Sequence, residues 1–124
     1  MIKLVYCIRK RDDIPADEFY RYWLEEHGPL VASVAGDIGA RRYVQSHTVL
    51  PELNAAMIEG RGLESPYDGI TEVWWESREQ LDRGLTSEAG VAAGARLVED
   101  ESRFIDFSRS RVFFTEEHEI FSNA

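Results

Sequence analysis

The order of strand and helix patterns constrains the fold of this 124-residue chain more than any other feature of its sequence. Runs rich in apolar, β-branched and aromatic residues predict strands at residues 2–8, 40–50, 70–76 and 103–115. Helical periodicity and a Ser77 capping pattern predict helices at residues 15–36 and 77–99. The resulting order predicts an α+β, ferredoxin-like βαββαβ fold, with a four-stranded antiparallel sheet and the helices on one face.

The other face of this sheet is left without helices, and it needs a cover. We expect Tyr43, Trp74 and either Phe104 or Phe107 to lie on it. Aromatic side chains in that number are most simply covered by a second copy of the chain. The sequence therefore predicts a homodimer whose two sheets close into a dimeric α+β barrel around a central cavity.

Length and composition indicate one domain, residues 1–117, followed by a polar, loosely ordered tail, residues 118–124. The lone Cys7 indicates a reduced environment. There is neither a signal-peptide pattern nor an apolar run long enough to cross a bilayer. We therefore expect a cytoplasmic protein.

The net charge of −9 argues against nucleic acid and anionic membranes as partners, because neutralising phosphates requires clustered Lys and Arg. The basic run at residues 9–11 is followed at once by Asp12 and Asp13. No CxxC, HExxH, GxGxxG or P-loop pattern occurs. We expect neither a metal nor a nucleotide cofactor.

The segment 19–31 is an aromatic-rich helix pattern that leads into His27, Gly28 and Pro29. Pro29 cannot donate a backbone hydrogen bond, so a kink or a helix end is expected beside His27. At such a break the imidazole is expected to point away from the packed face. His27 is thus a candidate catalytic residue, with a structural cap or a surface ring as the alternatives.

The chain resembles the EthD-like family of the dimeric α+β barrel superfamily. The resemblance rests on three groups of residues: Phe19, Tyr22, Trp23 and His27 to Val31; Arg42 to Gln45; and Asp68 to Trp75. A weaker match is Phe104-Ile105-Asp106. It spans residues 3–117 and implies the barrel fold and a homodimer.

The resemblance also implies a class of chemistry. Relatives include lactone isomerases of aromatic catabolism and dehydratases or decarboxylases of polyketide pigment pathways, which generally use no metal or organic cofactor. This implies a cofactor-independent isomerase, dehydratase or cyclase acting by proton transfer on an aromatic, lactone or polyketide-like molecule. The alternatives are a cofactor-free or haem-dependent oxygenase, and a non-catalytic accessory or binding protein of a catabolic, ether-degradation-like operon.

His27 matches the histidine of the family and is the expected general base. A helix restarting at Pro29 would keep its ring neutral. Tyr43, Gln45 and His47 share one strand face, where they could hydrogen-bond a phenolate or enolate oxygen.

Glu72 is expected to orient His27 or to act as a second acid–base group, with an ion pair to Arg41 or Arg42 as the alternative. Trp74 and Trp75 point to opposite faces of their strand, and we expect Trp74, together with Trp23, to contact the substrate.

Residues 51–68 form a connection too long for a hairpin, with a short helix at 53–58. Connections of this length commonly act as lids or binding loops. We expect its apolar side chains, or those of its dimer mate, beside the cavity of His27.

Overall fold

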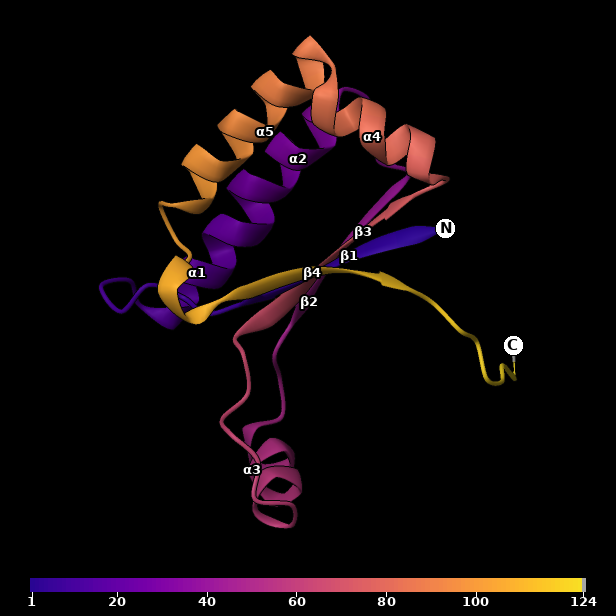
Figure 1. The fold of residues 1–124 in the computed structure, drawn as a ribbon. Helices are drawn as coiled ribbons and strands as arrows, with labels where there is room; N and C mark the ends of the chain where they lie inside the picture. Colours follow the sequence, from indigo (N-terminus) through magenta and orange to yellow (C-terminus); the bar gives the residue numbers. More distant parts are fainter. Residues whose placement is uncertain (124) are drawn as a thin grey trace.

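The computed structural model describes residues 1–123 and confirms the ferredoxin-like α+β fold (Figure 1). The strands are β1 (Ile2–Ile8), β2 (Arg42–His47), β3 (Gly69–Trp75) and β4 (Arg111–Glu116). The α-helices are α1 (Ala16–Tyr22), α2 (Gly28–Val34), α3 (Pro51–Glu59), α4 (Arg78–Thr86) and α5 (Glu88–Glu101). A π-helical turn, η1 (Trp23–His27), joins α1 to α2, and a 3-10 turn, η2 (Phe107–Arg109), precedes β4.

The sheet has the strand order β2-β3-β1-β4, and all neighbouring strands are antiparallel. In the centre, Leu4 pairs with Val73 and Phe114, while Tyr6 pairs with Thr71 and Val112. Paired residues point to the same face of a sheet. This register therefore brings side chains of β1, β3 and β4 together on the face of the sheet that the helices cover.

The helical layer covers one face of the sheet, with α2 and α5 side by side and α4 crossing above the end of β3 (Figure 1). One core cluster contains Ile8, Phe19, Trp23, Phe104 and Ile105. A second cluster contains Val73, Trp75 and Leu81. Both clusters contribute walls to the cavity described below.

The expected helix break at Gly28 and Pro29 is replaced by the π-helical turn η1. The Gly28 backbone N–H donates to the carbonyl of Trp23, five residues back, and Pro29 lies in the first turn of α2, where its missing N–H costs little. The helix therefore continues through His27, whose backbone is helical. Such π turns occur frequently at functional sites.

The last strand is shorter than the sequence predicts. Only Arg111–Glu116 pairs with β1, whereas Phe104 and Ile105 are buried in the core as the chain leaves α5. Apolar side chains in a short run satisfy a strand pattern and a core-filling turn equally well, which explains the difference. The structure has no helix or strand in residues 117–123, and the expected boundary at residue 117 stays a prediction; Ala124 lies outside the described residues.

The face without helices also differs from the expectation. Of the aromatic residues assigned to it, only Trp74 lies there. Tyr43 faces the helices, Phe104 is fully buried, and Phe107 lines the cavity. By the alternation along the strands, the bare face carries Lys3, Val5, Cys7, Arg42, Val44, Ser46, Ile70, Glu72, Trp74, Arg111, Phe113 and Thr115.

Residues 48–68, here called the arm, project from the ends of β2 and β3 on the side opposite the helices (Figure 1). The predicted short helix is present as α3, and none of its residues is buried. In its own subunit the arm is therefore far from the helical layer. The arm therefore does not cover the cavity of its own chain, and the expected alternative, contact from the arm of a dimer mate, stays a prediction.

Candidate active site

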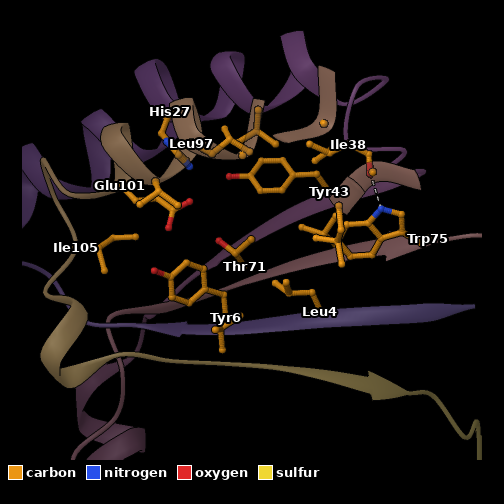
Figure 2. A pocket seen from close by; sticks show the side chains of 18 of the residues that line it. Leu4, Tyr6, His27, Ile38, Tyr43, Thr71, Trp75, Leu97, Glu101 and Ile105 are labelled. Carbon is orange, nitrogen blue, oxygen red and sulfur yellow. Dashed lines mark hydrogen bonds between the residues drawn. The ribbon is translucent and has the colours of Figure 1, made fainter. Parts of the chain in front are cut away.

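A cavity with a volume of ≈ 670 Å³ lies between the sheet and the helices of a single subunit (Figure 2). Most of its walls are apolar, from Leu4, Trp23, Val73 and Trp75 to the α5 residues Val91 and Leu97. Gly94 of α5 lines this cavity, and a Cβ atom at that position would meet no heavy atom within 4 Å, so the small residue leaves space there. The expected cavity between the two sheets of a dimer stays a prediction.

His27 reaches this cavity from the last residue of η1. Its side chain is buried, and its ring packs against Phe104 with the ring centroids 5.0 Å apart. The Nδ1 atom lies 2.7 Å from Oδ2 of Asp100 on α5. The Tyr22 hydroxyl donates to the other Asp100 oxygen. A carboxylate that accepts from Nδ1–H leaves Nε2 as the ring nitrogen able to take a proton.

Burial lowers the pKa of His27, and the hydrogen bond and charge of Asp100 oppose this shift only in part. The ring is therefore neutral at neutral pH, as expected of a general base. The cause differs from the predicted one: the helix is continuous through η1, so no exposed helix N-terminus acts on the ring.

Glu101, one residue beyond Asp100, points its carboxyl group into the same cavity (Figure 2). Burial raises the pKa of Glu101 to about 7; interaction with Tyr6 offsets this in part, and the nearby Asp100 adds to it. A carboxyl group with this pKa exists in both protonation states near neutrality, which suits it to acid–base chemistry.

Three hydroxyl groups complete the polar lining: those of Tyr6, Tyr43 and Thr71 (Figure 2). Burial, followed by the charge of Glu101, raises the pKa of Tyr6. Burial is also the main cause of the raised pKa of Tyr43. Both phenols therefore stay protonated and can donate hydrogen bonds to an oxygen of a bound molecule.

Gln45 and His47 support the site and do not line the cavity. The Gln45 Nε2 atom donates to the Tyr43 hydroxyl at 2.7 Å and to the Trp23 carbonyl at 2.8 Å. The His47 Nε2 atom lies 2.8 Å from Gln45 Oε1, and its ring stacks on Trp23, with the ring centroids 4.4 Å apart. These contacts fix Tyr43 and connect β2 to the π turn, because the Trp23 carbonyl belongs to η1. Trp23, which the sequence predicts to contact the substrate, lines the cavity.

Glu72 and Trp74, both predicted as site residues, do not line this cavity. They lie on the bare face of the sheet, because β3 turns Thr71, Val73 and Trp75 toward the helices. Glu72 is paired with Lys3 at 2.7 Å, and not with Arg41 or Arg42. Trp74 lies against the Arg42 guanidinium and donates through Nε1 to Glu117. The prediction that the two tryptophans face opposite ways holds, but Trp75 is the one in the cavity.

Asp100 and Glu101 were not predicted as site residues, although the sequence carries a signal for each. Both lie in the last turn of α5, where the helix dipole disfavours acidic residues. Glu101 also continues the stripe of Val91, Gly94 and Val98 at helical spacing, so it faces the same way as apolar residues. An acidic residue on an apolar stripe is costly to bury and indicates a functional site.

Among residues 1–123, no group of three or more His, Cys, Asp or Glu side chains gathers in a way that could hold a metal ion. Within the same range, no helix is long and apolar enough to cross a membrane. The polar groups of the cavity thus form an acid–base set of one imidazole, one carboxyl and three hydroxyls.

Residues 11–108 match the EthD domain family, so the chain belongs to this family. No curated protein matches the sequence. The remaining similarities come from solved structures.

One similar structure is an EthD family protein from Bacillus halodurans c-125, with 19% identity and a TM-score of 0.64, covering 95% of this chain and 99% of that one. Another is a dimeric protein of ferredoxin-like fold from Bacteroides fragilis NCTC 9343, with 13% identity and a TM-score of 0.58, covering 94% and 95%. A third is a mutant of SnoaB, a cofactor-independent oxygenase from Streptomyces nogalater, with 10% identity and a TM-score of 0.55, covering 95% and 93%. At these identities the likeness concerns the fold.

Proposed function

We propose that this EthD-family protein is a small cofactor-independent enzyme that transfers a proton on an aromatic, lactone or polyketide-like substrate, as an isomerase, dehydratase or cyclase. The observation that carries the proposal is the convergence of His27 and Glu101 on one mostly apolar cavity. A base with a lowered pKa and an acid with a raised pKa, both lining one apolar site, are the two groups such a reaction requires.

His27 takes the proton. Asp100 holds its Nδ1–H, so Nε2 is presented to the substrate in one tautomer and one orientation. As a substrate C–H beside a carbonyl loses its proton, negative charge develops on the carbonyl oxygen; when a phenol loses its proton, the charge lies on the phenol oxygen itself. General base catalysis of this kind contributes roughly 10²–10⁴ in rate.

Glu101 in its protonated form, with the hydroxyls of Tyr6, Tyr43 and Thr71, donates hydrogen bonds to that oxygen. These donors are held in place before the reaction, so they stabilise the developing enolate or phenolate without rearranging. Glu101 can also return a proton to a different atom of the substrate, which completes an isomerisation or assists the loss of water.

The substrate class follows from the walls. A cavity of ≈ 670 Å³ accepts a molecule of two or three fused rings. The acidic surface, with a net charge of −9, and the carboxyl of Glu101 disfavour anionic substrates. We therefore expect a neutral ligand that becomes negatively charged only during the reaction.

The functional unit of the proposal is a homodimer. The bare face of the sheet exposes Ile70 and Phe113 to 36% and 47%, and helices cover only the other face. The similar structure from Bacteroides fragilis is a dimeric protein with a ferredoxin-like fold. Two bare faces packed together would form the dimeric α+β barrel expected for this family.

The test uses a small-molecule probe, so that the natural substrate need not be known. 2-Tetralone, a bicyclic aromatic ketone with an acidic benzylic C–H, exchanges that hydrogen with solvent deuterium at a rate measurable by NMR. The protein should accelerate the exchange saturably, and His27→Ala should reduce the acceleration by at least ~10². Glu99→Gln, on the solvent side of α5, should retain it. Acceleration that is equal in His27→Ala and in the unaltered protein would refute the proposed base.

A cofactor-free oxygenase is the second candidate, because it can begin with the same deprotonation. The similar fold of SnoaB, described as a cofactor-independent oxygenase, keeps it open. Consumption of molecular oxygen with a phenolic substrate would favour it over the isomerase class. Tight binding of ring compounds without exchange would instead indicate a binding protein.

A further inference from the structure

The arm carries an uncovered apolar surface. Val49, Leu50, Leu53, Met57 and Leu63 are each 55–65% exposed. Hydrogen bonds hold the arm only at its two ends, next to the sheet. Thr48 donates to the Tyr67 carbonyl, and Arg9 donates to the carbonyls of residues 65 and 66. A helix of nine residues is not stable alone in water, and no α3 residue is buried. The arm therefore needs a surface on which to pack.

A second uncovered surface is the mouth of the cavity. We define the mouth by six cavity-lining side chains that are nevertheless 46–57% exposed: Leu85, Val91, Val98, Phe107, Val112 and Phe114. They belong to α4, α5, η2 and the edge strand β4. The cavity is thus open along the β4 side, where these apolar walls are exposed to solvent. Proton transfer to a reactive intermediate requires this opening to be closed.

The two surfaces cannot meet within one chain, because α3 of the arm lies below the sheet, whereas α4 and α5, which carry Leu85, Val91 and Val98 of the mouth, lie above it (Figure 1). A second copy can bring them together. We consider two subunits that pack by the bare faces of their sheets and are related by a two-fold axis parallel to the strands. Because β2 and β4 are the two edge strands, this axis places the β2 edge of one sheet over the β4 edge of the other. The arm begins at the C-terminal end of β2, the same end at which β4 and η2 begin.

Charge favours the same arrangement. The arm carries Glu52, Glu59 and Glu64 against one arginine, Arg61. Arg111 begins the edge strand β4 on the bare face, next to Val112 of the mouth. In the described part of the chain, none of these five charged residues forms an ion pair. Acidic side chains on one subunit and an unpaired arginine on the other are complementary at this edge.

We propose that the arm of each subunit packs across the mouth of its partner's cavity, so that the candidate active site is completed by the second copy. The inference rests on the proposed homodimer but not on the proposed reaction. Leu53 and Met57 lie four residues apart on one face of α3 and are the side chains expected to contact the mouth. The partner thus supplies the missing apolar wall.

Cross-linking between two chains tests this directly. In a Cys7→Ser background, a tagged chain with Met57→Cys is mixed with an untagged chain with Phe107→Cys, and a short bis-maleimide is added. Both positions are about half exposed, so the substitutions should be tolerated. The matched control replaces Met57→Cys with Glu59→Cys, on the opposite side of α3. A third mixture uses Phe121→Cys, in the exposed tail.

The expected result is a mixed dimer formed at least ~10-fold faster by Met57→Cys than by Glu59→Cys or Phe121→Cys. Equal rates for Met57→Cys and Glu59→Cys, a faster reaction from Phe121→Cys, or a monomer by light scattering would each overturn the proposal. Activity does not enter this readout. A protein that cross-links as expected but fails to exchange 2-tetralone would refute the proposed function and leave the arm's place intact.

Discussion

The Nδ1 atom of His27 lies 2.7 Å from the Oδ2 atom of Asp100, although 73 positions separate the two residues in the sequence. The contact joins the π-helical turn η1 to the last turn of α5. It fixes the tautomer of a buried imidazole whose other nitrogen is then available to the cavity. Two helical segments that are remote in the sequence therefore hold the candidate base in place together.

Asp100→Asn should reduce the rate of proton exchange by roughly 10² or more, because the neutral amide no longer favours one His27 tautomer and no longer stabilises imidazolium. Asp100 raises the pKa of His27 against the effect of burial. Its removal should therefore lower that pKa further and move the acidic limb of the pH–rate profile to lower pH. Tyr22→Phe, which keeps the carboxylate, should have a smaller effect; an unchanged acidic limb in Asp100→Asn would contradict this role.

Glu101 should make the protein less stable at high pH. Its pKa is raised from 4.5 to about 7 in the folded state, so the folded chain holds a proton that the unfolded chain releases between these values. Stability therefore falls as the pH rises from about 4.5 to about 7, by about 2–3 kcal/mol.

Glu101→Gln should remove this dependence. Urea unfolding should show the variant to be more stable than the unaltered protein at pH 8 and equal to it near pH 4.5. Glu99→Gln, exposed on the same helix, is the control and should change neither value. A Glu101→Gln variant that is no more stable at pH 8 would show that the carboxyl group is not buried as described.

Two substitutions at Gly94 test the stability of α5 and the volume of the cavity independently. A Cβ atom at this position would meet no heavy atom within 4 Å. Gly94→Ala should therefore stabilise the protein by about 0.5–1 kcal/mol, the usual gain within a helix. Gly94→Phe should fill the cavity and weaken binding of ring compounds, measured by calorimetry.

Gly90 provides the contrast on the same helix. A Cβ atom there would collide with the Gly84 carbonyl, where α4 and α5 approach each other. Gly90→Ala should therefore lower the melting temperature. If Gly94→Ala and Gly90→Ala had the same effect, the cavity would not lie beneath Gly94.

The fold could be predicted from the sequence because each element has its own local pattern. The order of strands and helices, the Ser77 cap and the short helix within residues 51–68 all depend on neighbours a few residues apart. The end of the chain could not be predicted in the same way. Phe104 and Ile105 have the composition of a strand, and only their packing against Phe19 and Trp23 shows that they belong to the core.

The site was predictable in part. His27 follows from its place on a helix and lines the cavity. Tyr43 also lines it, but from the strand face opposite to the expected one. Alternation along β3 separates Trp74 from Trp75 but does not say which faces the helices. Glu72 shares the bare face with Trp74, so neither of them lines the cavity. The partnership of His27 with Asp100 depends on a contact between distant helices, which no local pattern reports.

The pH dependence of 2-tetralone exchange tests the central claim most directly, because His27 and Glu101 each set one limb. Exchange requires neutral His27, so the rate should rise with pH through the lowered pKa of that residue, below 6.5. It also requires protonated Glu101, so the rate should fall again as the pH rises through about 7. In Glu101→Gln the fall at high pH should disappear while the rise at low pH remains. A fall that persists unchanged in Glu101→Gln, or a rise that persists in His27→Ala, would contradict the assignment of the acid and the base.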